Sequence, residues 1–129
     1  MPQLFFYNAH WPDDKRKGET FDYFAQQIPS GWKELLRDLS MKLYRLGWDG
    51  GYYQIKEKFG TLRFYWKNNI KDKELAAIAD DVVAYAEDKS GYICDVCGEW
   101  GSVRGDLGWI LTLCNKHYEE RLREVREDD

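Results

Sequence analysis

The chain has few of the residues that cross-link segments or carry reactive side chains. It contains three cysteines and two histidines among 129 residues, and three thiols cannot all pair, so the disulfide framework of a small secreted protein is not expected. No apolar run of about eighteen residues is present, and residues 1–17 lack the apolar stretch and the cleavage site of a signal peptide. We therefore expect a soluble cytoplasmic protein without a membrane partner.

An excess of positive charge is also absent. The 19 Lys and Arg residues are outnumbered by 23 Asp and Glu, which gives a net charge of -4. Non-specific binding to nucleic acid depends on neutralising phosphates, so a histone-like role is disfavoured, although a local basic patch is not. The sequence also lacks a phosphate loop, a dinucleotide fingerprint and a nucleophile elbow. We expect a protein that is not an enzyme.

All three cysteines and one histidine lie in two short motifs. Cys94 and Cys97 form a CxxC pair, and Cys114 and His117 form a CxxH pair further along the chain. Three thiolates and an imidazole are ligands that zinc binds tetrahedrally, and the i, i+3 spacing of the CxxH pair places both ligands on one face of a helix. Because four protein ligands leave no open position, the pattern predicts a structural Zn2+ ion. A disulfide between two of the cysteines is the competing interpretation.

The segments around these motifs follow a definite order. Gly98 comes directly after the CxxC knuckle, a β-rich run fills residues 109–113, and a charged helix is predicted from His117 to about residue 127. Knuckle, hairpin and helix in this order resemble a treble-clef zinc finger over residues 92–127. We expect residues 92–129 to form the finger and to pack as one unit with a core built from residues 1–91.

The fold class that we predict is α+β, a small antiparallel sheet with amphipathic helices and a C-terminal treble-clef-like zinc finger. Ser30 is the predicted N-cap of a long helix that ends at Gly47. Its predicted apolar face consists of Trp32, Leu35, Leu36, Leu39, Leu43 and Leu46. A further helix is predicted from about residue 72 to 89, and its predicted buried residues are Leu75, Ile78, Ala79, Val82 and Ala86. Residues 4–7 are predicted to be an edge strand and residues 8–20 an exposed loop.

Residues 52–67 predict a β-hairpin with Phe59 and Gly60 as its two-residue loop. In this register Lys56 lies opposite Arg63, and Tyr53 lies opposite Trp66. One face is predicted to pack against the core and carries Tyr53, Ile55, Leu62, Phe64 and Trp66. The other face carries Gln54, Lys56, Lys58, Arg63, Tyr65 and Lys67.

The pair formed by Lys56 and Arg63 is the main indication of a ligand. Like charges opposite one another destabilise a hairpin unless a carboxylate or an anionic ligand lies between them. Clustered cations beside a tyrosine are suited to holding phosphates and stacking a base. The candidate ligand-binding residues are Lys56, Lys58, Arg63, Tyr65 and Lys67. The alternatives are a solvated face whose lysines prevent edge pairing, and a face neutralised by a neighbouring acidic helix.

A family resemblance accompanies these motifs. Residues 56–65 read KEKFGTLRFY, and they are followed by CxxCG, by a strand that contains tryptophan and by CxxH. Together with the Gly31-Trp32 helix start, these motifs resemble a family of small proteins of unassigned activity found in phages, prophages and bacteria. The resemblance covers residues 30–118, and it implies a role in the contest between phage and host without implying a reaction.

Three functions are compatible with these features. The first is a non-enzymatic binder that sequesters an anionic small molecule, such as a nucleotide immune signal, on the hairpin. The second is a protein-interaction module whose finger and terminal helix bind a host or phage protein, or a second copy of the chain. The third is a DNA- or RNA-binding zinc finger. Catalysis is disfavoured because every cysteine is a predicted metal ligand and His10 is the only other imidazole.

Overall fold

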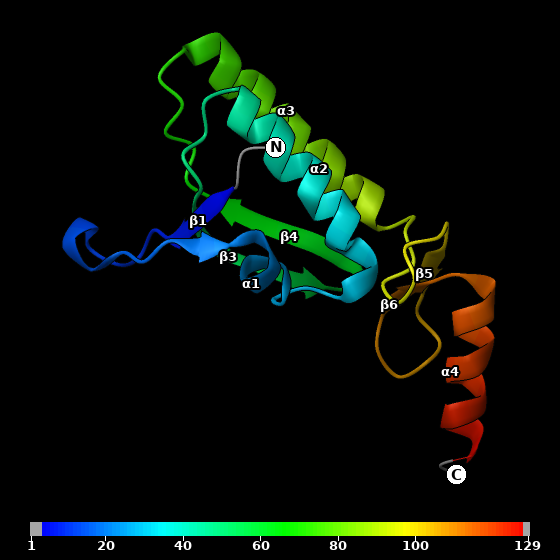
Figure 1. Ribbon diagram of the computed structural model, residues 1–129. Helices are drawn as coiled ribbons and strands as arrows, with labels where there is room; N and C mark the ends of the chain where they lie inside the picture. Colours follow the sequence, from blue (N-terminus) through cyan, green and yellow to red (C-terminus); the bar gives the residue numbers. More distant parts are fainter. Residues whose placement is uncertain (1–3, 128–129) are drawn as a thin grey trace.

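The computed structural model describes residues 4–127, and it has an α+β fold with helices on a small sheet and a hairpin and helix at the C-terminal end (Figure 1). The strands are β1 (Phe5–Asn8), β2 (Glu19–Thr20), β3 (Gly51–Lys58), β4 (Thr61–Trp66), β5 (Ser102–Arg104) and β6 (Leu111–Leu113). The α-helices are α1 (Phe21–Ala25), α2 (Lys33–Arg45), α3 (Lys73–Ser90) and α4 (Asn115–Glu127), with short 3-10 helices η1 (Asp13–Lys15) and η2 (Ser30–Trp32). No helix among the described residues is long and apolar enough to cross a membrane.

Strands β1 to β4 form a sheet in the order β2-β1-β3-β4. β1 pairs in parallel with β3, whereas β1 with β2 and β3 with β4 are antiparallel. The predicted antiparallel sheet with residues 4–7 at its edge is therefore wrong, because the sheet is mixed and β1 lies inside it. Between β1 and β3 the chain passes through β2, α1 and α2, and a helical crossover allows a later strand to run in the same direction. Neither β2 nor α1 was predicted.

The hairpin of β3 and β4 has the predicted register over most of its length. Lys58 pairs with Thr61, and the pairing continues without a shift as far as Gln54 opposite Tyr65. Phe59 and Gly60 have φ values of 54° and 83°, the left-handed conformations that a type I′ turn requires. The two-residue loop thus aligns the strands as the sequence predicts.

The predicted register fails at the open end of the hairpin. A bulge between Tyr52 and Gln54 places Tyr52, and not Tyr53, opposite Trp66. Tyr52 is consequently buried, whereas Tyr53 is 40% exposed instead of packing in the core as predicted. The bulge adjoins Gly51 and Tyr52, where β3 pairs with β1, so the pairing with a strand distant in sequence accompanies the irregularity.

The core next to the sheet is largely aromatic. Phe6 of β1 and Phe24 of α1 stack with their ring centroids 4.1 Å apart. Trp48 packs edge-on against Phe64 and Trp66 of β4, with centroid distances of 5.9 and 6.0 Å. Many of the abundant aromatic residues are therefore used to build the core, where each buries a large apolar area.

The start of α2 differs from the prediction. Ser30 opens the short 3-10 helix η2, and the α-helix begins at Lys33. The Ser30 hydroxyl donates to the carbonyl of Val96 at 3.4 Å rather than capping the helix. Gly47 follows the helix with a φ of 110°, as its predicted role requires. The predicted apolar face is buried at Trp32, Leu35, Leu36, Leu39 and Leu43.

α3 has the predicted position but a different buried face. Asp72 is its N-cap, and the carboxylate accepts from the N–H groups of Glu74 and Leu75 at 2.9 and 3.0 Å. Leu75 and Ile78 are 37% and 48% exposed rather than buried. The buried residues are Ala79, Val83, Ala86 and Ser90, which are small or β-branched and let the helix lie close to its neighbours.

α3 covers the free edge of β4. The Ser90 hydroxyl accepts from the Leu62 N–H at 2.7 Å, and the Glu87 carboxylate accepts from the Phe64 N–H at 2.9 Å. These N–H groups point away from β3 and would otherwise form an edge open to pairing with another chain. Because Glu87 and Ser90 face β4, the helix is rotated so that Ile78 lies outside the core.

Asp49 connects the turn before β3 to β1. Its carboxylate accepts hydrogen bonds from the Tyr7 hydroxyl at 2.5 Å, the Asn69 amide at 2.7 Å and the Gly51 N–H at 3.0 Å. Burial acts to raise the pKa of Asp49, but these hydrogen bonds and the charge of Lys67 outweigh it and hold the pKa below 3.8. Burial, together with the hydrogen bond to Asp49, raises the pKa of Tyr7 to about 12.

The direction of these shifts predicts how stability varies with pH. The contribution of the Asp49 carboxylate to the free energy of unfolding is present above the unfolded pKa of 3.8. It is lost as the pH falls through the lower folded pKa. The contribution of the Tyr7 hydroxyl to the free energy of unfolding is present below the unfolded pKa of 10.0. It is lost as the pH rises through the folded pKa of about 12. We expect Asp49→Asn to lower the free energy of unfolding by about 1 kcal/mol at neutral pH and by less in strong acid, as measured by urea denaturation. An equal loss under both conditions would contradict this assignment.

Candidate metal centre

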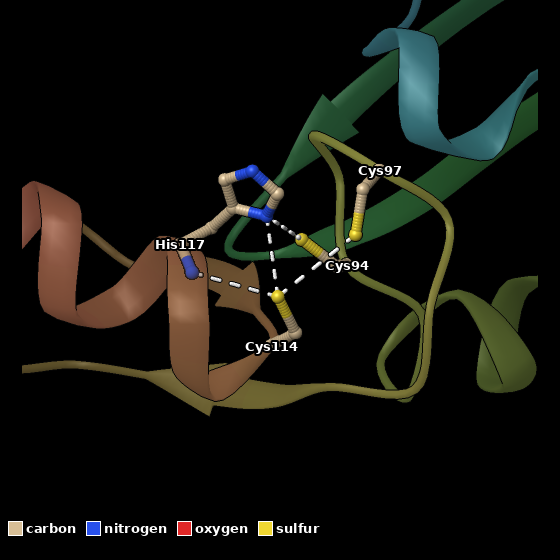
Figure 2. A group of neighbouring side chains, drawn as sticks. All are labelled: Cys94, Cys97, Cys114 and His117. Carbon is tan, nitrogen blue, oxygen red and sulfur yellow. Dashed lines mark hydrogen bonds between the residues drawn. The ribbon is translucent and has the colours of Figure 1, made fainter.

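The structure brings Cys94, Cys97, Cys114 and His117 together, as the sequence predicts (Figure 2). The two residues of the CxxC motif lie on the loop after α3, and Cys114 lies between β6 and α4. α4 begins at Asn115, slightly before the predicted start, so His117 is in its first turn. The four donor atoms lie within 4.8 Å of one another, and the group can hold a metal ion.

Three of the distances within the cluster are close to those of a tetrahedral arrangement. Cys97 Sγ lies 3.9 Å from Cys114 Sγ, and His117 Nδ1 lies 3.2 Å from Cys114 Sγ and 3.5 Å from Cys94 Sγ. Metal bonds of about 2.0–2.3 Å at tetrahedral angles separate neighbouring ligand atoms by about 3.5–3.8 Å. The other ring nitrogen, Nε2, lies 4.0 Å from the Glu120 carboxylate, on the side where an outer partner orients a ligating imidazole.

The knuckle around Cys94 favours a thiolate. Cys94 is fully buried, which acts to raise its pKa, but backbone N–H groups that point at the sulfur lower the pKa to about 7. These N–H groups belong to Cys114, Cys97 and Val96. Gly98, with a φ of 82°, donates its N–H to the Cys94 carbonyl at 3.0 Å and closes the knuckle. The thiolate is the form that coordinates a metal, so the buried ligand is prepared for binding.

The loop that carries Cys94 and Cys97 is held against the core by the segment before α2. The Trp32 indole N–H donates to the carbonyl of Ile93 at 2.8 Å, and the Gly31 N–H donates to the carbonyl of Asp95 at 2.9 Å. Trp32 is fully buried, so loss of this acceptor would leave its indole N–H without a partner in the core. The sequence identified Gly31 only as part of a helix start and Trp32 as part of the apolar face of the helix, because their contact with the loop has no local signal.

A second contact joins β6 to the turn of the β3–β4 hairpin. Thr112 is fully buried, and its hydroxyl donates to the carbonyl of Gly60 at 2.5 Å. The Thr112 carbonyl accepts from the Asp95 N–H at 2.9 Å, so one residue touches both the hairpin turn and the CxxC loop. Both the hairpin and the start of α2 therefore contact the residues around the metal ligands.

The candidate ligand-binding residues are spread along the hairpin. Lys56 is directly opposite Arg63, as predicted, and its ammonium lies 6.0 Å from the centroid of the Tyr65 ring. Lys58 is at the turn, where its ammonium lies 5.4 Å over the neighbouring aromatic ring. Lys67 follows the last residue of β4, at the opposite end of the hairpin. The structure thus brings Lys56, Arg63 and Tyr65 together and separates Lys58 from Lys67.

The cations of the hairpin have no carboxylate partner among residues 4–127, where every ion pair with an N···O distance up to 4.0 Å involves other residues. The Nε atom of Arg63 is buried and has no hydrogen-bond acceptor in this part of the chain. Arg63 lines a hollow of about 200 Å3 with Glu87 and Asp88, but the Glu87 carboxylate already accepts from Phe64. A buried donor without an acceptor costs about 1–3 kcal/mol, so the Arg63 side chain is held in this position at an energetic cost.

Comparison with protein-family models, with curated proteins and with solved structures found no match. The fold and the site define an α+β protein with a small mixed sheet and a Cys3His group near its C-terminal end that can hold a metal ion.

Proposed function

We propose that this is a non-enzymatic binding protein whose C-terminal part is a treble-clef-like finger stabilised by zinc. Three thiolates and an imidazole form a ligand set that zinc favours, and all four ligands come from the protein. A closed set leaves no position for water or substrate, which supports a structural ion rather than a catalytic one. The order of knuckle, β5–β6 hairpin and α4 around the ligands supports the treble-clef assignment.

The binding surface in this proposal is the outer face of the β3–β4 hairpin, and its ligand is a small phosphate-bearing anion such as a nucleotide. The observation that carries the proposal is the buried Arg63 Nε without an acceptor, directly opposite Lys56. Phosphate oxygens accept hydrogen bonds from a guanidinium and offset the repulsion between the two cations. Tyr65 is 46% exposed beside Lys56 and offers a surface on which a base stacks.

The charge of the whole protein supports a small ligand over a polymer. At a net charge of -4 the protein repels a polyanion that extends beyond the hairpin, whereas a small anion meets mainly the local cations. In the role implied by the resemblance to phage proteins, the protein would sequester a nucleotide signal of the host defence. Sequestration requires affinity for the nucleotide but no catalysis, so it needs no open coordination position on the metal.

Arg63→Gln is expected to weaken nucleotide binding by about tenfold or more in calorimetric titrations with ADP, ADP-ribose and cyclic di-AMP. A hydrogen bond to a charged group contributes about 1.5–3 kcal/mol, and 1.4 kcal/mol is a factor of ten in affinity. Arg45→Gln is the matched control, because Arg45 is exposed at the end of α2 and away from the hairpin face. No heat from any of the three probes, or equal affinities of the Arg63→Gln and wild-type proteins, would count against the proposal.

A protein-interaction module is the second candidate, because the finger exposes large apolar side chains. Trp100 and Trp109 are 73% and 64% exposed, and α4 projects away from the sheet without a buried residue among those described (Figure 1). Tryptophan is enriched at protein interfaces. The titration separates the two functions, since a module of this kind shows no nucleotide binding that depends on Arg63 and is isolated as a dimer or with a host protein. Oligonucleotide binding that weakens steeply with salt would indicate the nucleic-acid function instead.

A further inference from the structure

The loop between β1 and β2 is a closed unit that projects from the sheet (blue, at the left of Figure 1). Its ends are held together by the antiparallel pairing of Phe6 with Glu19. Within it, the Trp11 N–H donates to the Asn8 carbonyl at 3.3 Å and the Lys15 N–H donates to the Pro12 carbonyl at 2.9 Å. A compact surface loop whose ends are close together, of the Ω type, is frequently functional.

Arg16 braces the loop from inside. Its Nε donates to the Trp11 carbonyl at 3.0 Å, its guanidinium pairs with Asp13 at 2.5 Å, and its Cζ lies 4.7 Å over the Tyr7 ring. The Tyr7 hydroxyl in turn donates to the Asp49 carboxylate. Arg16 and the loop are therefore connected to the turn before β3. A loop ordered before it meets a ligand loses less conformational entropy on binding.

The braced loop lines an open hollow of about 700 Å3, within the size range of small-molecule sites. Its lining includes Trp11, the ammonium-bearing Lys15 and Lys17, and the carboxylate-bearing Asp14 and Glu19. Trp11 is 57% exposed, although its carbonyl is fixed by Arg16. Lys15 and Lys17 are exposed and have no carboxylate within 4.0 Å among the described residues. The hollow therefore combines an aromatic surface, two unpaired cations and two carboxylates.

We propose that this hollow binds a nucleoside phosphate. The base stacks on Trp11, and the phosphate oxygens accept from the ammonium groups of Lys15 and Lys17. Asp14, which has no ion-pair partner in the described part of the chain, accepts hydrogen bonds from the ribose hydroxyls. Glu19 already accepts from the Tyr52 hydroxyl at 2.5 Å and shapes the wall of the hollow.

The carboxylates also determine which anions the hollow excludes. Asp14 and Glu19 repel a bare phosphate or pyrophosphate, which has charge but no hydroxyl groups to donate to them. A nucleoside phosphate offers the base and the hydroxyls as well as the charge, so all three kinds of side chain find a partner. This site is separate from the outer face of the hairpin, and its existence does not depend on the function proposed for Arg63.

The test is a calorimetric titration of ADP into the Arg63→Gln protein, in which binding at the hairpin face is weakened. Trp11→Leu is expected to weaken ADP binding by about tenfold, because stacking of a base on an aromatic side chain contributes substantially to affinity. The double change Lys15→Gln and Lys17→Gln is expected to weaken it by at least fivefold. Pyrophosphate is expected to bind at least tenfold more weakly than ADP.

Trp109→Leu is the matched control, since Trp109 is 64% exposed but lies on the finger, and it should leave ADP binding unchanged. The substituted side chains in the loop are exposed, and the Trp11 contact with Arg16 uses a backbone carbonyl that the variant keeps. The proposal is overturned if ADP does not bind, if either loop change leaves its affinity unaltered, or if pyrophosphate binds as tightly as ADP.

Discussion

Cys97→Ser is expected to yield protein without bound metal, with residues 92–127 unfolded and the rest of the chain melting at a lower temperature. Binding of a structural zinc ion contributes about 10–16 kcal/mol in small finger peptides, which is as large as the whole stability of a typical domain. The hydrophobic cluster of the finger is small, since its buried members are Cys94, Leu107 and Leu113. Elemental analysis of the purified protein and far-ultraviolet circular dichroism during heating measure both effects.

The rest of the chain is affected because the finger supplies partners to buried groups outside it. Without an ordered loop, the Trp32 indole loses its acceptor at Ile93, and the Gly60 carbonyl loses the Thr112 hydroxyl. An unsatisfied buried polar group costs about 1–3 kcal/mol. We therefore expect a lower melting temperature for the core and not only a loss of helical signal from α4.

Two further variants separate metal loss from a general effect of substitution. Cys97 is exposed, so an oxygen in place of its sulfur disturbs little packing and tests mainly coordination. His117→Gln should also release the metal, whereas His10→Gln should keep it, because His10 is exposed and outside the cluster. A Cys97→Ser protein that retained one metal ion per chain and its wild-type melting temperature would show that the metal does not hold the finger.

The parts of the structure that the sequence predicted depend on local geometry. The CxxC and CxxH spacings each place two ligands of the metal site within one turn of chain, and Gly98 allows the knuckle to close. The two left-handed residues Phe59 and Gly60 align Lys58 with Thr61, and every pair up to the bulge follows from that alignment. Short-range constraints of this kind are visible in a single sequence.

The parts that the sequence did not predict depend on segments that are distant along the chain. The burial of Tyr52 instead of Tyr53 goes with the pairing of β3 with β1. The rotation of α3 follows from hydrogen bonds that Glu87 and Ser90 make with β4. Periodicity alone favoured Leu75 and Ile78 for the core because it counts apolar residues and cannot anticipate a polar residue that covers a strand edge.

The contact between the start of α2 and the loop that carries Cys94 and Cys97 also joins segments that are distant along the chain. It gives Gly31 a role that the sequence did not reveal. A Cβ atom at Gly31 would lie 2.2 Å from the Cys94 carbonyl oxygen and 2.5 Å from the Asp95 carbonyl carbon. Both are backbone atoms of the knuckle that carries the buried metal ligand, so neither can move without displacing the ligand. The glycine is required here by the close approach of two backbones.

Gly31→Ala is accordingly expected to destabilise the protein by about 2–4 kcal/mol. Overpacking at a well-packed position costs about 1–3 kcal/mol, and the hydrogen bond from Gly31 N–H to the Asp95 carbonyl contributes about a further 1 kcal/mol. Because the knuckle must shift, the metal should also be removed faster by a chromogenic chelator. Urea denaturation of the metal-loaded protein measures the first effect, and the absorbance of the chelator measures the second.

Gly105→Ala is the matched control for this change. It lies between β5 and β6, and a Cβ atom there would meet nothing within 4 Å, so the same substitution should alter the free energy of unfolding by no more than about 0.5 kcal/mol. If Gly31→Ala were as stable as Gly105→Ala and released its metal at the same rate, the close approach of the helix start to the knuckle would be wrong. The converse result would show that the start of α2 positions the metal ligands, which joins the core of the protein to its metal centre.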